Sequence, residues 1–151
     1  MKAKILFPLL AVVFICLMAI YFLINPSYEK SLEAKYYFET ANYEKAYELA
    51  NEAFKMDSYN RMASTIMAQS KTSLKYQKYV QDAKKYLQEI NTIVSQESIS
   101  DADRAKIKMM SEIMVDSYVK LAPSIITNKA LVKEAKMYHK NFEKLLEKVN
   151  R

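Results

Sequence analysis

The chain has 151 residues and a formal net charge of +6, and it contains no glycine and no tryptophan. Without glycine it lacks both a glycine-rich phosphate-binding loop and the tight primed turns of β-hairpins. One cysteine and one histidine cannot form a Cys/His metal cluster, and three arginines equip the chain poorly for reading nucleic acid. We therefore expect no metal, no cofactor, no nucleic acid, no small-molecule substrate and no enzyme activity.

The first element is an uncharged apolar run from Ile5 to Ile24. A helix of this length spans about 30 Å, which matches the hydrocarbon core of a bilayer. The run is too long for the apolar part of a cleaved export signal, and no small-x-small cleavage site follows it. The sequence therefore predicts a transmembrane anchor that contacts the lipid bilayer over residues 5–24.

Lysines on either side of this run predict its orientation. Lys2 and Lys4 precede it, and basic residues next to a membrane span stay in the cytoplasm. We expect residues 1–4 to be a short cytoplasmic tail and the rest to lie in the periplasm, beside a bacterial inner membrane. The bias is thin, because Lys30 and Lys35 follow the run, so the inverted topology stays open.

After the anchor, the lack of glycine and the helical spacing of the apolar residues predict an all-α soluble domain over residues 27–151. About six antiparallel helices are expected, paired as hairpins over about 28–57, 60–95 and 101–149.

The first hairpin begins after Pro26, with Ser27 as the expected N-cap. Its first helix is expected to run to Thr40 and to end in a left-handed turn at Asn42, and its second helix to run from Tyr43 to Met56. The apolar positions expected to be buried are Ala34, Tyr37, Phe38 and Ala41 on the first helix and Tyr43, Ala46, Ala50, Ala53 and Phe54 on the second.

The second hairpin is predicted from two apolar stripes that a polar stretch separates. The first stripe runs from Ala63 to Leu74 and the second from Val80 to Val94. Adding 37 to the residue numbers of three alanines in the first hairpin gives three apolar residues of this second stripe. This correspondence indicates a repeat. The paired positions are Ala46 with Ala83, Ala50 with Leu87 and Ala53 with Ile90.

The third hairpin starts at a capping box formed by Ser100 and Asp103. Its first helix is expected over 101–121, with Ala102, Ala105, Met109, Ile113 and either Tyr118 or Leu121 buried. The last helix, over 128–149, has an apolar seam at Leu131, Ala135, Tyr138, Phe142, Leu145 and Val149. That seam is consistent either with packing over the preceding hairpins or with pairing to another chain. His139, beside the seam, is expected at the surface.

The segment YYFETANYEKAYELANEAFKMD, residues 36–57, resembles a tetratricopeptide repeat, a helical hairpin with small residues where its two helices touch. The residues that match the family pattern are Ala34, Tyr37, Tyr43, Ala46 and Ala53. The departures are Lys30 in place of tryptophan, Glu33 in place of leucine, Ala50 in place of an aromatic residue and Ser58 in place of proline. The resemblance implies stacked hairpins with a concave surface for a peptide segment of a partner.

On such a surface the candidate partner-binding residues are Leu32, Tyr36, Glu39, Tyr59 and Met62. These features favour a non-catalytic scaffold that binds other proteins of a membrane-associated complex, such as a flagellar motor, secretion or pilus assembly. Two alternatives stay open. The methionine-rich helices suit a membrane-tethered holdase, and the inverted topology suits a cytoplasm-facing receptor.

Overall fold

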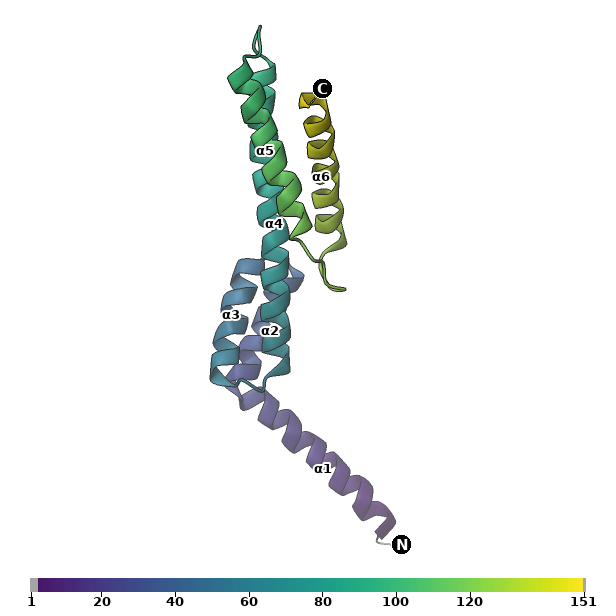
Figure 1. The fold of residues 1–151 in the computed structure, drawn as a ribbon. Helices are drawn as coiled ribbons and strands as arrows, with labels where there is room; N and C mark the ends of the chain where they lie inside the picture. The colour runs from purple at the N-terminus through teal and green to yellow at the C-terminus, as the bar shows by residue number, and fades with distance from the viewer. Residues whose placement is uncertain (1–2, 151) are drawn as a thin grey trace. The chain divides into compact units, whose positions relative to one another are not determined.

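The computed structural model describes residues 3–150, and it describes side chains over 7–21 and 24–150. Over residues 3–150 the chain forms six helices and no strand, which confirms the all-α prediction (Figure 1). The helices are α1 (Ala3–Ile24), α2 (Pro26–Glu39), α3 (Tyr43–Met56), α4 (Arg61–Val94), α5 (Asp101–Val119) and α6 (Lys129–Val149). The chain divides into two compact units, unit 1 up to Ser70 and unit 2 from Lys71.

Helix α1 has a continuous apolar surface along its described side chains. Every side chain over 7–21 is exposed and none is charged. No single helix among the described residues is long and apolar enough to cross a bilayer; Phe7–Tyr21 and α2 meet that criterion only together, as a pair bent by 74°. The anchor over 5–24 therefore stays a prediction. Met1 and Lys2 of the expected tail lie outside the described residues.

Helix α2 begins with a proline-containing cap. The side chain of Asn25 accepts a hydrogen bond from the backbone N–H of Ser27 at 3.0 Å, and Pro26 is the first helical residue. Proline is favoured there because its fixed φ suits the helix and its missing N–H is not needed. The prediction that Ser27 is the N-cap is wrong by two positions, since the proline after Asn25 already starts the helix.

The turn between α2 and α3 is a Schellman motif built without glycine. The N–H of Asn42 donates to the carbonyl of Tyr37 at 2.9 Å, and that of Ala41 donates to the carbonyl of Phe38 at 3.1 Å. The left-handed residue is Ala41, with φ of 62°, and not Asn42 as expected. Asn42 instead caps α3 by accepting from the N–H of Lys45 at 3.3 Å. An alanine therefore bears the backbone strain that glycine usually avoids.

Small residues bring α2 and α3 together in the core of unit 1. The alanines expected at this contact, Ala34, Ala46 and Ala50, are fully buried. Leu49 and Ile66, the latter from the start of α4, complete the same cluster. The predicted first hairpin over 28–57 is thus present as α2 and α3.

Helix α4 continues without a break for 34 residues. The predicted hairpin over 60–95 is therefore wrong, and five helices follow α1 instead of about six. The stretch 75–79, which we interpreted as polar, contains no proline or glycine, and its Tyr76 and Tyr79 are buried. These two tyrosines join the flanking apolar stripes into one. The 37-residue offset consequently does not correspond to a second helical hairpin.

In unit 2 the remainder of α4 shares one core with α5 and α6. The buried members are Tyr76, Tyr79, Val80, Ala83, Ile90 and Ile93 of α4, Ile107, Met110 and Met114 of α5, and Ala135 and Phe142 of α6. Helix α5 runs antiparallel to α4, because Lys106 pairs with Glu89 at 2.6 Å and the rings of Tyr118 and Tyr79 lie 5.7 Å apart.

The capping box at the start of α5 is confirmed. Ser100 Oγ accepts from the N–H of Asp103 at 3.1 Å, and the Asp103 carboxylate accepts from the N–H of Ser100 at 3.2 Å. Two hydrogen bonds to its carboxylate, from the Ser100 hydroxyl at 2.6 Å and from the Ser100 N–H, hold the pKa of Asp103 below its ordinary value. The helix ends at Val119 and not at Leu121.

Most of the predicted buried face of α5 is wrong. Four side chains expected inside are exposed, Ala102, Ala105, Met109 and Ile113, whereas the alternatives Tyr118 and Leu121 are both half-buried against the core. The buried stripe consists of Ile107, Met110, Ser111 and Met114. The serine made this stripe appear too polar for a core position. However, Ser111 Oγ donates to the carbonyl of Ile107 at 2.8 Å, so its hydroxyl has a hydrogen-bond partner within the helix.

Helix α6 follows its prediction closely. Asn128 caps it, and Ala135 and Phe142 of the seam are fully buried. The four other seam residues, Leu131, Tyr138, Leu145 and Val149, pack against the same core. The seam is therefore occupied within unit 2, as the packing interpretation predicts.

Candidate interaction surface

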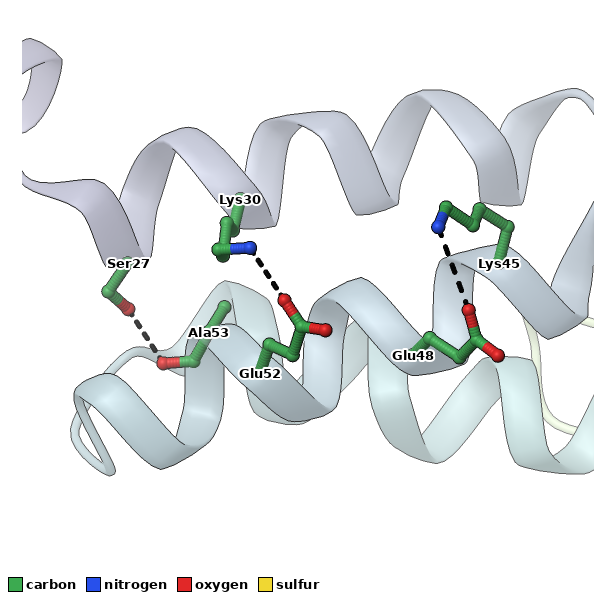
Figure 2. Close-up of polar contacts among 6 residues, drawn as sticks. All are labelled: Ser27, Lys30, Lys45, Glu48, Glu52 and Ala53. Carbon is green, nitrogen blue, oxygen red and sulfur yellow. Dashed lines mark hydrogen bonds and ion pairs between the residues drawn. The ribbon is translucent and has the colours of Figure 1, made fainter.

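A buried polar network fixes the start of α2 against the α3–α4 turn. Asn60 Nδ2 donates to the hydroxyl oxygens of Ser27 and Ser31, at 2.8 Å each. Its Oδ1 accepts from the N–H of Ala63 at 3.1 Å, which caps α4. Ser27 Oγ donates in turn to the carbonyl of Ala53 at 2.9 Å (Figure 2). Because both amide hydrogens and the amide oxygen are used, the network is satisfied and rigid.

An ion pair bridges α2 and α3 one turn further along. Lys30 contacts Glu52, and Figure 2 shows the two side chains reaching toward each other from facing helices. The hydrogen bond from Lys30 holds the pKa of Glu52 below its ordinary value, and the same bond raises the pKa of Lys30. On α3 itself Lys45 lies 3.7 Å from Glu48. The buried network and the Lys30–Glu52 pair together orient α2 about its axis.

With that orientation, one side of α2 presents two large apolar side chains to solvent. Leu32 and Tyr36, one helical turn apart, are 53% and 64% exposed. Exposed carboxylates flank this pair on both sides, from Glu29, Glu33 and Glu39. We call these five residues the α2 face. Two lysines lie beside it: Lys35 is 3.8 Å from Glu39, and Lys30 interacts electrostatically with Glu33 and Glu29.

The five predicted binding residues do not form one surface. Leu32, Tyr36 and Glu39 share the α2 face. Tyr59 is 89% exposed but lies in the α3–α4 turn, where its N–H donates to the Asp57 carboxylate at 2.9 Å. Met62 is half-buried and packs against the core of unit 1, so its side chain contributes to stability more than to an open surface.

Unit 2 has an open groove that we did not predict. It lies between α4 and the end of α5 and has a volume of 360 Å³. We call it the α4–α5 groove and define it by Lys75, Lys78, Tyr86, Ile113, Lys120 and Leu121. Lys75 and Lys78 on one wall are 45 and 42 positions from Lys120 on the other. No local sequence pattern therefore indicates the groove.

Beneath this region a chain of aromatic rings crosses the core of unit 2. The rings of Tyr118 and His139 are stacked 4.1 Å apart, and Tyr118 also contacts Tyr79. His139 is only 16% exposed, so its predicted surface position is wrong, because Tyr118 covers the ring. Its Nε2 lies 3.4 Å from a carboxylate oxygen of Glu143. Burial raises the pKa of the Tyr79 phenol, and the charge of Glu143 raises it further.

Chemical groups suited to catalysis or metal binding are sparse. Among the described residues, no three His, Cys, Asp or Glu side chains are grouped to hold a metal ion. The hydroxyl of Tyr79 and Nδ1 of His139 are buried without a hydrogen-bond partner in the described chain. Comparison with protein-family models, curated proteins and solved structures finds no match for this chain.

Proposed function

We propose that this chain is a non-catalytic protein-interaction module held at a membrane by α1, with the α2 face as its binding surface. The observation that carries the proposal is the exposure of Leu32 and Tyr36 beside the closed core of unit 1. An exposed aromatic side chain flanked by an aliphatic one is typical of interface anchors. The tetratricopeptide-like pattern of residues 36–57 supports the same role.

Membrane attachment is part of this proposal. Exposed apolar surface as extensive as that of α1 is unusual in a soluble protein and favours a lipid or protein environment. The lysines at positions 2 and 4 favour a cytoplasmic N-terminus and a periplasmic location for the rest, in a bacterial envelope assembly. A reporter fused after Arg151 that is active only in the periplasm tests this orientation, and activity of a cytoplasmic reporter there would contradict it.

The interaction itself is tested by copurification from membranes after mild crosslinking. The full chain is compared with the double variant Leu32→Glu, Tyr36→Glu and with a matched control, Glu44→Gln, Glu48→Gln, on the exposed side of α3. We expect the α2 variant to lose partners that the control retains. An unchanged partner set would reject the α2 face. Recovery of many unrelated unfolded proteins would instead favour a holdase.

A further inference from the structure

The α4–α5 groove extends along one side of unit 2. Its α4 wall runs from Lys75 to Tyr86, eleven helical steps, or about 16 Å at the helical rise of about 1.5 Å per residue. Its opposite wall comes from Ile113 and from Leu121, just beyond α5. The volume of 360 Å³ is near the low end of ligand sites, about 300 to 1,000 Å³, and accommodates a few side chains.

Charge is distributed unevenly along this groove. Because α4 and α5 are antiparallel, Lys120 lies near Lys75 and Lys78 at one end, and Tyr86 and Ile113 lie at the other. Asp82 also lines the groove and pairs with Lys78 at 3.1 Å, whereas no ion pair within the described residues holds Lys75 or Lys120. A suitable occupant is therefore an amphipathic helix with carboxylates at one end and a large apolar side chain at the other.

The α2 face of a second molecule has this chemistry. From Glu29 to Glu39 it spans ten helical steps, or about 15 Å, which matches the length of the groove wall. Glu29 and Glu33 lie toward its N-terminal end, and Tyr36 lies toward its C-terminal end. Glu39 follows Tyr36 and is paired with Lys35 at 3.8 Å. The sequence segment 26–60 carries four basic and seven acidic residues, whereas 71–151 carries sixteen basic and ten acidic residues, so their net charges, −3 and +6, are opposite.

We propose that the α2 face of one molecule docks into the α4–α5 groove of a second molecule, with Glu29 and Glu33 at the lysines and Tyr36 at the apolar end. This inference rests on the function proposed for the α2 face and names its partner as another copy of the chain. Because the two surfaces differ, the contact is heterologous. Each molecule in a pair keeps one unused surface, and copies join head to tail.

Complementary charge reversals test this contact. The full chain in mild detergent is examined by native mass spectrometry over a range of concentrations. Reversal of the α2 face (Glu29→Lys, Glu33→Lys) or of the groove (Lys75→Glu, Lys78→Glu) is expected to weaken self-association at least about tenfold. An equimolar mixture of the two variants should restore association, because the intact face pairs with the intact groove and the reversed face and reversed groove are again opposite in charge.

The control has the same charge change as the groove variant on an exposed part of α6, Lys140→Glu, Lys144→Glu, and should assemble like the parent. Circular dichroism establishes that each variant folds. Assembly that survives both reversals, as contact through α1 would, overturns the proposal, and so does a mixture that stays monomeric. If copies do not associate but Leu32→Glu, Tyr36→Glu still loses copurifying proteins, this inference fails and the proposed function stands.

Discussion

Asn60 Nδ2 lies 2.8 Å from Ser27 Oγ, although the two residues are 33 positions apart, and both side chains are buried. Through this contact the turn before α4 holds the first turn of α2 in place. The same asparagine also caps α4 through Ala63. One side chain therefore links three helices of unit 1 and positions the helix that carries the α2 face.

Replacement of Asn60 is expected to destabilise unit 1 strongly. Asn60→Ala removes a helix cap and leaves two buried hydroxyls without a donor, which together cost about 2 to 4 kcal/mol. Chemical denaturation of the full chain in detergent, followed by circular dichroism, measures the loss. The matched control is Asn42→Ala, which removes the exposed cap of α3 and should cost about 1 kcal/mol. Equal losses in the two variants would show that the buried network is not cooperative.

Ala41 offers a stabilising substitution. It has a φ of 62°, a conformation that costs a residue with a Cβ about 1 kcal/mol relative to glycine. Ala41→Gly should therefore raise the free energy of unfolding by about 0.5 to 1 kcal/mol, even though glycine adds entropy to the unfolded chain. At the exposed helical position Ala105, the same substitution should lower it by about 1 kcal/mol. A destabilised Ala41→Gly variant would contradict the left-handed turn.

The Lys30–Glu52 pair predicts a specific pH dependence. The folded-state pKa of Glu52 is below its ordinary value of 4.5, so its contribution is present above that pH and is lost as the pH falls through the folded value. The difference in unfolding free energy between the parent and Glu52→Gln should shrink from about pH 6 to about pH 3. Because the pKa of Lys30 is raised above 10.5, its contribution to the free energy of unfolding is lost only above pH 10.5.

The continuity of α4 is tested by proline. Gln77→Pro lies inside the stretch that we interpreted as a break, and a proline within a helix costs about 3 kcal/mol or more. Glu97→Pro, in the connection between α4 and α5, should cost much less. Denaturation midpoints that are equal for the two variants would indicate a loop at residues 75–79 and would restore the second hairpin.

The errors of the sequence interpretation have physical causes. Tyr76 and Tyr79 lie among lysines and a glutamine, yet their rings provide apolar surface that α5 and α6 cover. On α5 two apolar stripes compete, and only packing against α4 and α6 selects the one that contains Ser111. The cap of α2 was predictable, because proline after asparagine marks the first helical turn.

Part of the candidate site could be predicted from the sequence, and part could not. Helical spacing alone places Leu32, Tyr36 and Glu39 on one side of α2, away from the buried Ala34. The α4–α5 groove joins residues that lie more than forty positions apart, so it requires the fold. The stacking of His139 on Tyr118 likewise depends on how α6 meets α5.

The most direct test of the α2 face uses a photoreactive amino acid in the full, membrane-bound chain. Placed at Tyr36, it should crosslink to a protein partner upon illumination. Placed at Glu44, on the exposed side of α3, it should give little or no such product, although this position is also exposed. A clear adduct from position 36 alone is the predicted result. No adduct from 36, or equal adducts from both positions, would contradict the assignment of the binding surface.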